Sequence, residues 1–258
     1  MTLASSTQTL WTVGGPSRVR PDVVRVFERD PDLLADVDAA TAEVLRRRVV
    51  APRLQLARGP WAPRPEDPRF AGALGLLVLD GLVIRTICVQ GRACAELVGA
   101  GDLLRPWETA QDGLVEGPCA WRVLEPTTVA ILDRQFAAVV ARCPSVIVTL
   151  FARGAQRTRG LALNLALAHI RQAEVRLLTL FWHLAGRWGR MTPRGVELPL
   201  PLTHELLGQL VCLHRPTTST ALQRLAGAGE IARTPKRGWL LLGDPPACEH
   251  PAQAARAA

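Results

Sequence analysis

The side chains best suited to chemistry lie between residues 203 and 224, where hydroxyl and guanidinium groups recur at helical spacing. Thr203 is an N-cap residue for a short helix with leucines on one face, and Cys212-Leu213 predicts a tight turn after it. A second helix is expected next, with His214 as its cap and Pro216 in its first turn, where proline is tolerated. Its outward face carries Arg215, Thr217, Ser219, Thr220, Gln223 and Arg224.

This outward face has the chemistry of a major-groove reader. Arginine can place two N–H donors on guanine O6 and N7, and threonine can contact a thymine methyl group or a phosphate. A basic hairpin is expected directly afterwards, with Lys236 and Arg237 at its tip, and such a tip meets the phosphate backbone. An isolated amphipathic helix pair is explained by packing alone, so the basic face and the basic hairpin together are what favour double-stranded DNA as the partner.

The segment GQLVCLHRPTTSTALQRLAGAGEIART…GWLLL resembles the winged helix-turn-helix of the Crp-Fnr family of bacterial regulators. CPSVIVTLFARGAQRTRG…AHIRQAEVRLLTLFWHLA is similar to the family's dimerisation helix and the helix after it, with Arg176 where the family usually has arginine. GAGDLL (99–104) is similar to the Gly-Asp turn of its cyclic-nucleotide-type β-roll. The resemblance covers about residues 70–243. It implies an α+β fold with an N-terminal antiparallel β-roll, a long dimerisation helix and a C-terminal winged helix-turn-helix.

The same resemblance implies how the chain acts. It implies a homodimeric transcription regulator on a near-palindromic operator, and it leaves RNA polymerase open as a further partner. Arg215 is implied to read a base, followed by Thr217 and Thr220, although cyclic-AMP-binding members have arginine where Thr220 stands and Glu where Pro216 stands. The full set of predicted DNA-contacting residues is Thr203, His214, Arg215, Thr217, Ser219, Thr220, Arg224, Lys236 and Arg237.

The cyclic-nucleotide cassette of the family is missing. LRPWETAQDGLVEGPCAWRV follows the Gly-Asp turn without the family's Gly-Glu or its Arg, small hydroxyl residue and Ala. The family's adenine-contacting Thr-Ser pair falls at Leu161 and Ala162, which offer no side-chain donor. A buried cyclic phosphate needs charge-assisted donors, so we expect no cyclic AMP binding of the usual kind. Arg105, Trp107 and Arg122 are candidates to line another effector pocket, the alternative being ordinary surface or core positions.

The order of elements suggests five segments. We predict a flexible leader (1–20), a sensory domain (21–143), a dimerisation helix (144–171), the DNA-binding domain (172–243) and a flexible tail (244–258). Short helices broken at Pro31 are expected over 22–50 and a proline-rich loop over 59–70. Turn residues at Asp80-Gly81, Gln90-Gly91 and 99–101 separate short apolar runs over 74–104, and Asp80-Gly81 in particular predicts a hairpin. Residues 121–133 predict two short strands turning near Pro126. The apolar stripe over 144–170 fits a buried core helix or a dimer spine, and its length favours the spine.

Composition narrows the class of protein further. The chain has 258 residues, 48 % of them hydrophobic, which is enough for two domains. Its net charge of +8 is almost all arginine, with Lys236 the single lysine. The prevalence of arginine over lysine is better explained by codon bias in a GC-rich genome than by function, whereas the basic excess by itself suits a nucleic-acid partner or a merely basic protein equally well. The leader lacks the order of a signal peptide and no apolar run reaches the ~18–20 residues of a membrane span, so we expect a cytoplasmic protein without membrane contact.

Metal, cofactor and enzyme chemistry find no support in the sequence. The six cysteines form no C-x-x-C or zinc pattern, and we expect them to be reduced and mostly in the core. Iron–sulfur sensors of the family cluster their cysteines near the N-terminus, whereas no cysteine precedes Cys88 in this chain. His169 is expected to be a core histidine rather than a haem ligand. HELLG (204–208) is not H-E-x-x-H, and no phosphate-binding loop or G-x-S-x-G occurs. The carboxylates at 102, 108, 112 and 116 are best explained by a solvated loop.

One alternative from a different class stays open. The second helix is poor in long polar side chains, apart from Arg215 and Arg224. The winged helix of a ligand-sensing or protein-interaction module could therefore serve as a docking surface without reading DNA.

Overall fold

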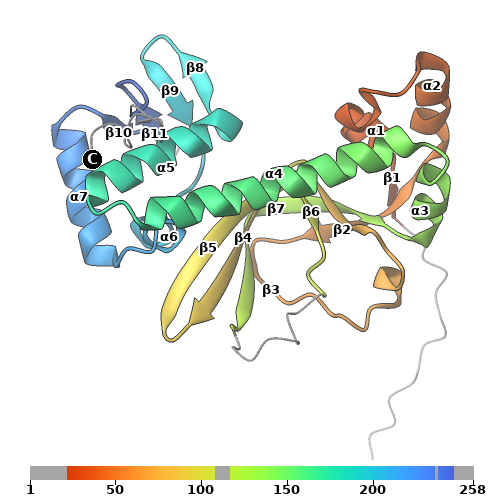
Figure 1. Cartoon of the computed structure of the whole chain (residues 1–258), viewed down its shortest axis with the longest axis horizontal. Coiled ribbons are helices and arrows are strands. Elements are labelled where there is room, and N and C mark those ends of the chain that lie inside the picture. Colours follow the sequence, from red (N-terminus) through yellow and green to blue (C-terminus); the bar gives the residue numbers. More distant parts are fainter. Residues whose placement is uncertain (1–21, 108–116, 236–237, 247–258) are drawn as a thin grey trace, which may run out of the picture.

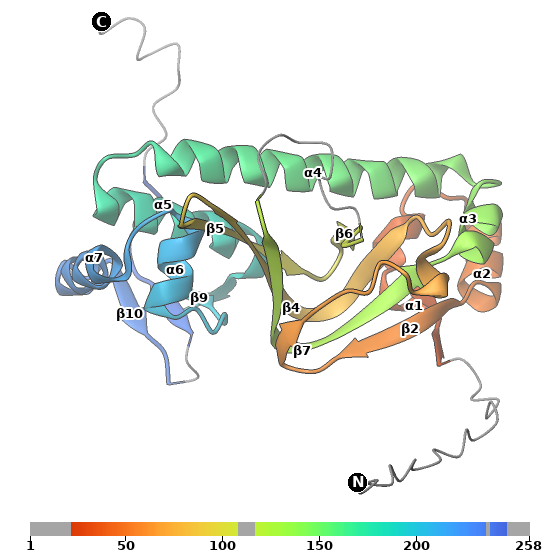
Figure 2. The same cartoon turned by 90° about the horizontal axis from the view of Figure 1, so that it is seen from below.

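A long helix, α4 (Pro144–Ala168), runs along the molecule, with a β-roll on one side and a smaller helical domain at its C-terminal end (Figures 1 and 2). The computed structural model describes residues 22–107, 117–235 and 238–246. The predicted leader and residues 247–258 of the predicted tail lie outside these ranges. The α+β fold class predicted from the sequence is confirmed.

The roll is one antiparallel sheet in the order β1-β2-β7-β4-β5, with β3 on β7 and β6 on β4. Its strands are β1 (Val23–Val24), β2 (Ala51–Leu56), β3 (Gly59–Trp61), β4 (Gly75–Val89), β5 (Arg92–Gly99), β6 (Leu103–Leu104) and β7 (Cys119–Leu132). Short helices close the end away from the smaller domain: α1 (Val26–Arg29), the 3-10 turns η1 (Pro31–Leu34) and η2 (Pro68–Phe70), α2 (Ala39–Arg48) and α3 (Arg134–Val140).

The hairpin predicted at Asp80-Gly81 is wrong, because β4 continues through these residues without reversing direction. The register against β7 shifts on both sides of Asp80, which marks a bulge rather than a chain reversal. Asp80 Oδ1 accepts a hydrogen bond from the backbone N–H of Thr128 at 2.9 Å. Gly81 has φ +89°, and a Cβ there would lie 2.5 Å from the Pro126 carbonyl oxygen of β7. The turn-forming residues therefore bend a long strand.

The pair of strands predicted to turn near Pro126 is wrong for the same reason. β7 is a single strand of 14 residues, and Pro126 lies at the bulge opposite Gly81. Proline lacks a backbone N–H, so it fits a point where the hydrogen-bond ladder is already interrupted. The turn expected at Gln90-Gly91 is confirmed, since Val89 pairs with Arg92 and both turn residues have positive φ.

The proline-rich stretch 59–70 is not all loop. Its first residues form β3, which pairs with β7 from Val123 to Trp121. Pro60 is accommodated there because β3 is a short edge strand. The helices expected over 22–50 with a break at Pro31 are present as α1, η1 and α2.

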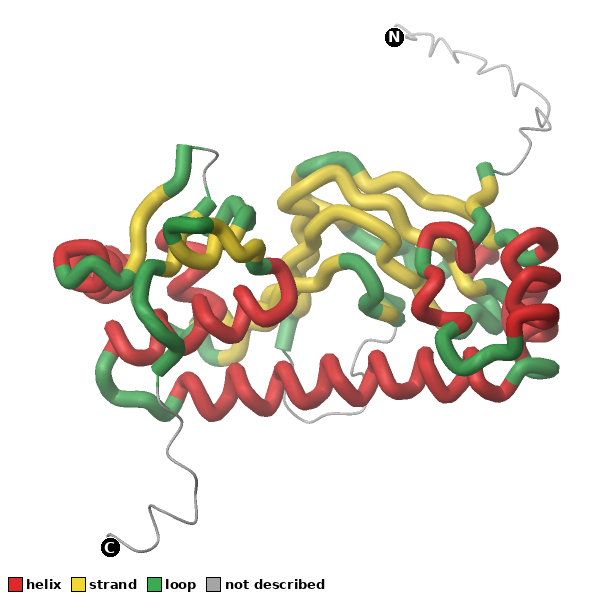
Figure 3. Tube along the Cα trace, turned by 90° about the horizontal axis from the view of Figure 1, so that it is seen from above, coloured by secondary structure: helices red, strands yellow, loops and turns green. Residues whose placement is uncertain are grey.

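The C-terminal domain combines three helices with a small sheet (Figure 3). Its elements are α5 (Ala173–Trp188), β8 (Arg190–Thr192), β9 (Gly195–Leu198), α6 (His204–Leu210), α7 (Arg215–Gly227), β10 (Ile231–Arg233) and β11 (Trp239–Leu241). The sheet has the order β10-β11-β9-β8, so the expected hairpin β10–β11 is extended by the hairpin that precedes α6.

The core of this domain continues into the roll. One apolar cluster joins Leu180, Leu222 and Trp239 of the C-terminal domain to Leu82, Ile84, Ala95 and Leu124 of the roll and Leu167 of α4. A second cluster fills the interior of the roll with side chains such as Leu76, Val98 and Ile131, and a third packs the N-terminal helices against its outer side. The DNA-binding half and the sensory half predicted from sequence therefore share buried surface.

Within the described residues, no single helix has the length and apolar character needed to cross a membrane. Only α3 and α4 taken together meet that criterion, and a 118° bend separates them.

Candidate nucleic-acid interface

The α6–turn–α7 unit is built as its sequence predicts. Thr203 Oγ1 accepts a hydrogen bond from the Leu206 N–H at 3.2 Å and caps α6. The turn contains Cys212 at φ +56°, and the Leu213 N–H returns to the Gly208 carbonyl at 2.8 Å. A Cβ at Gly208 would lie 2.6 Å from the Leu213 carbonyl oxygen, so glycine allows the tight crossing. His214 occupies the N-cap position of α7 without a side-chain capping bond.

Helix α7 has one buried and one exposed face. Thr218, Ala221, Leu222 and Leu225 are buried, and the Thr218 hydroxyl donates to the His214 carbonyl at 3.1 Å. Arg215, Thr217, Thr220 and Gln223 are exposed, as predicted for the groove-facing side. Ser219 is only half-exposed, and its hydroxyl lies 2.9 Å from His204 Nδ1.

Arg224 is engaged with its own domain. Its guanidinium donates to Glu174 Oε1 of α5 at 2.8 Å, and this contact lowers the pKa of Glu174. The ion pair ties the end of α7 to α5. Lys236 and Arg237 lie outside the described residues, so the basic hairpin tip stays a prediction.

A cavity of about 640 Å³ adjoins the exposed start of α7 and gathers positive charge. Arg215 lines it together with Arg58 of the roll and Arg233 of β10, and His204 lies beside them. Partial burial, and then Arg233 and Arg215, lower the pKa of His204. Arg233 stacks 3.7 Å from the Trp239 ring centroid.

Three of these cavity residues were missed in the sequence analysis. Arg233 and His204 belong to the helix-turn-helix segment, at the end of β10 and the start of α6, and no sequence pattern marked them as lining a cavity. Arg58 follows β2 in the other half of the chain, and only the tertiary structure brings it to the start of α7.

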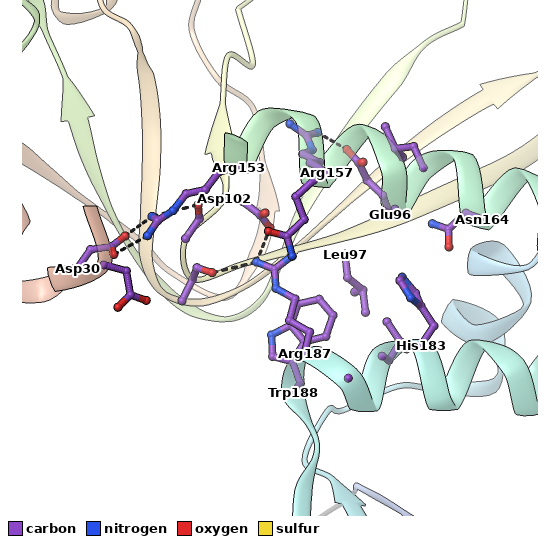
Figure 4. A pocket seen from close by; sticks show the side chains of 18 of the residues that line it. Asp30, Glu96, Leu97, Asp102, Arg153, Arg157, Asn164, His183, Arg187 and Trp188 are labelled. Atoms are coloured by element: carbon purple, nitrogen blue, oxygen red, sulfur yellow. Dashed lines mark hydrogen bonds and ion pairs between the residues drawn. The ribbon is translucent and has the colours of Figure 1, made fainter. Parts of the chain in front are cut away.

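A second cavity, of about 650 Å³, lies between the roll, α4 and α5 (Figure 4). Four arginines line it, each paired with a carboxylate, and the first of them, Arg29, contacts Asp80 at 2.6 Å. Arg153 contacts Asp30 at 2.7 Å, Arg157 contacts Glu96, and Arg187 contacts Asp102 at 2.9 Å. The Asn164 side-chain oxygen is buried without a hydrogen-bond partner. Because each guanidinium is already neutralised, an anionic ligand would have to displace a carboxylate.

Asp102 was expected to lie in a solvated loop, and this expectation is wrong. It is 7 % exposed rather than solvated, and it accepts hydrogen bonds from the Gly99 N–H and from Arg187. Arg187 also donates to the Ala100 carbonyl at 2.9 Å. The Gly-Asp turn of the roll is therefore fastened directly to α5.

The three ligand-pocket candidates do not form one site. Arg105 lies over the Trp107 ring at 5.7 Å, and Trp107 stacks on Phe70 at 4.6 Å. Arg122 is exposed on β7 opposite Pro60. None of the three lines either cavity, so their role in binding an effector stays a prediction.

Two further expectations are wrong. Of the cysteines within the described residues, Cys94, Cys119 and Cys212 are exposed and Cys88 and Cys143 are half-buried, so none is fully buried, and only Cys143 packs against a core cluster. His169 is exposed at the C-terminal end of α4 rather than buried. Across residues 22–107, 117–235 and 238–246, no three His, Cys, Asp or Glu side chains are grouped to hold a metal ion.

An N-capped α6, a tight turn, an exposed polar face on α7 and a following β-hairpin define a helix-turn-helix protein. Comparison with known proteins agrees: residues 175–248 match the model of the Crp-like helix-turn-helix domain. No curated protein matches the chain significantly by sequence.

Solved structures share the fold over most of the chain. A variant of CooA from Carboxydothermus hydrogenoformans has 20 % identity and a TM-score of 0.60, covering 75 % of this chain and 84 % of that one. FixK2 from Bradyrhizobium japonicum has 19 % identity and a TM-score of 0.57, covering 76 % and 94 %. The c-di-GMP-responsive regulator CLP from Xanthomonas campestris has 18 % identity and a TM-score of 0.55, covering 80 % and 100 %. The chain thus carries a Crp-like helix-turn-helix domain and has the architecture of Crp-Fnr family regulators.

Proposed function

We propose that this protein is a sequence-specific DNA-binding transcription regulator that acts as a homodimer. The observation that carries the proposal is the exposed Arg215, Thr217 and Thr220 face of α7 on a Crp-like helix-turn-helix domain. A helix presented in this way enters a major groove with its N-terminal residues at the base edges. CLP, one of the proteins that share the fold, is named as a c-di-GMP-responsive global regulator of gene expression, and the function proposed here is likewise regulatory.

The contacts sort into base reading and backbone positioning. Arg215 at the first turn of α7 is the base reader, with the exposed Thr217 and Thr220 beside it. Thr203 and His214 stand at the starts of α6 and α7, where backbone N–H groups attract phosphate. Ser219 and Arg224 hold His204 and Glu174 in the free protein, so either must exchange that contact to reach DNA.

One face of helix α4 carries a stripe of residues, here called the α4 seam, against which we expect the second subunit to pack. Val148, Phe151, Ala155, Thr158, Ala162 and Leu165 recur at alternating steps of three and four residues, which is the spacing of a two-helix coiled coil. Val148, Phe151 and Leu165 are 63 %, 77 % and 66 % exposed. On the opposite side, Val146, Leu150 and Leu167 are buried in the rest of the chain. In a homodimer of this kind we expect the two copies of α7 to enter successive major grooves, about 34 Å apart, one turn of DNA.

Regulation by cyclic AMP of the usual kind is not part of the proposal. Leu161 and Ala162 offer only hydrocarbon at the surface of α4, and apolar side chains fill the interior of the roll. A cyclic phosphate placed there would lose its hydration without gaining charged donors. If a small-molecule effector exists, the cavity between the roll, α4 and α5 is the place we propose for it, because all three parts contribute residues.

Selection of bound DNA from a random pool, followed by gel shifts, tests the proposal. Arg215→Ala should lose roughly 1–3 kcal/mol of preference at one base position. The matched control is Arg190→Ala, which removes an exposed arginine from β8 and should keep the preference. Unchanged affinity and preference for Arg215→Ala would refute the base-reading role.

Salt dependence separates the proposal from its alternative. A DNA-binding protein releases counterions from phosphates, so its affinity should fall steeply between 50 mM and 200 mM salt. Absence of DNA affinity even at low salt would instead indicate that the winged helix is a docking surface for another protein or domain.

A further inference from the structure

Arginines from both halves of the chain line the cavity of about 640 Å³ at the start of α7. Arg58 lies between β2 and β3 of the roll, Arg215 begins α7, and Arg233 ends β10. Over residues 22–107, 117–235 and 238–246, no ion pair joins any of these guanidinium groups to a carboxylate. The arginines that line the cavity between the roll, α4 and α5 are, by contrast, each paired. The positive charge at the start of α7 therefore has no partner in the described part of the chain.

The other polar groups that line this cavity are mostly hydrogen-bond donors. Thr203 Oγ1 accepts a hydrogen bond from the Leu206 N–H at 3.2 Å, and Thr234 Oγ1 accepts one from the Gly238 N–H at 3.0 Å. Each threonine keeps an O–H that can donate to a ligand. Glu205 is the single carboxylate that the described residues contribute to the lining. The cavity thus offers an excess of donors and of positive charge, which is the chemistry of an anion site.

The pKa of His204, which also lines the cavity, reflects this positive potential. Its Nδ1 lies 2.9 Å from the Ser219 hydroxyl. Burial first, and then Arg233 and Arg215, lower the pKa of His204. Burial also lowers the pKa of Arg233, whose guanidinium lies 3.7 Å from the Trp239 ring centroid. The cationic groups are close enough to repel one another, so an anion between them would relieve that repulsion.

We propose that this cavity is a phosphate-binding site, in which Arg58 of the roll and Arg233 of the β10–β11 hairpin hold a phosphate group beside Arg215. Guanidinium groups bind phosphate through charge-assisted, often bidentate hydrogen bonds. The volume falls in the range of about 300–1,000 Å³ that ligand clefts have. The phosphate belongs either to the DNA backbone, next to the base that Arg215 reads, or to a soluble phosphate compound. In both cases the roll takes a direct part in what happens at the start of α7.

The first experiment tests the DNA backbone as the source, and it rests on the proposed DNA-binding function. Each phosphate contact contributes about 0.9 to the slope of log K against log salt concentration. Arg58→Ala in the full-length protein should therefore lower that slope by about 1.8 for a dimer on two half-sites, and weaken binding evenly across DNA sequences. Arg58→Lys keeps the charge and should keep the slope. The matched control, Arg48→Ala, removes an exposed arginine from α2 at the far end of the roll (Figure 1) and should also keep it.

The second experiment tests a soluble source by thermal unfolding of the free protein. Inorganic phosphate or pyrophosphate is added and compared with sodium chloride at equal ionic strength. A ligand that binds only the folded chain raises its melting temperature. For a soluble source, wild type and Arg48→Ala should gain roughly 2–4 °C over the chloride sample, and Arg58→Ala should gain nothing.

The two experiments together decide the proposal. A lower salt slope for Arg58→Ala identifies the DNA backbone as the source, and stabilisation by phosphate that Arg58→Ala loses identifies a soluble compound. If Arg58→Ala matches Arg48→Ala in both its salt slope and its response to phosphate, the proposal is overturned. Wild type that binds no DNA even at low salt would count against the proposed function instead, and the thermal experiment would then decide the phosphate site by itself.

Discussion

Replacing Phe151 with alanine should weaken the proposed dimer without unfolding the subunit. Phe151 lies on α4 with 77 % of its surface exposed, in the seam with Val148 and Leu165. Full burial of a phenylalanine side chain contributes roughly 1.5–3 kcal/mol. Two symmetry-related copies, each covering the exposed fraction, therefore contribute about 2–5 kcal/mol to association. The dimer Kd should rise by roughly 30-fold to 3,000-fold, since each 1.4 kcal/mol is a factor of ten.

Sedimentation equilibrium over a range of protein concentrations measures this change, and circular dichroism checks that the fold is kept. The matched control is Met191→Ala, because Met191 on β8 is 84 % exposed but does not lie on α4. It should leave the dimer Kd unchanged. An equal loss in both variants would show a general effect of surface apolar area. An unchanged Kd for Phe151→Ala in a protein that still dimerises would refute the α4 seam.

Three further predictions concern stability. Thr203→Ala should lower the free energy of unfolding by about 1 kcal/mol, because the bond that caps the Leu206 N–H is lost, and urea titration measures this. Gly81→Ala should cost about 3 kcal/mol, since its φ is +89° and a Cβ would meet the β7 backbone; Gly91→Ala, at φ +72° with open space around it, should cost about 1–2 kcal/mol. Equal losses at the two glycines would contradict the bulge. Burial first, then nearby arginines, lower the pKa of His204, so the unfolded chain binds the proton more readily and stability should fall as the pH drops below about 6.5. His204→Gln should flatten that pH dependence of the melting temperature, and an unaltered profile would contradict it.

The errors in the sequence analysis have a common physical origin in the roll. Asp80, Gly81 and Pro126 are residues that turns favour, and their local preferences are satisfied in the structure. A bulge and a chain reversal both need an interrupted ladder and a glycine at positive φ, so the local sequence does not separate them. Gln90-Gly91 was predicted correctly because there the strands on both sides pair with each other across a two-residue turn.

The cysteines show a similar limit. Burial of a cysteine depends on which strand face or turn meets the core, and composition says only that the residue is small and apolar. Cys94 was expected in the core, whereas it lies exposed on β5.

The sequence by itself determined the helix-turn-helix, since its N-cap, its tight turn and the buried and exposed positions of α7 all follow from contacts within a few residues. It also indicated α4, whose apolar residues recur at helical steps. Only the tertiary structure decided how the two halves meet: Arg58 lines the same cavity as Arg215 at the start of α7, and Arg187 fastens the Gly-Asp turn to α5. These contacts depend on long-range packing of the roll against the C-terminal domain, which no local preference of the chain encodes.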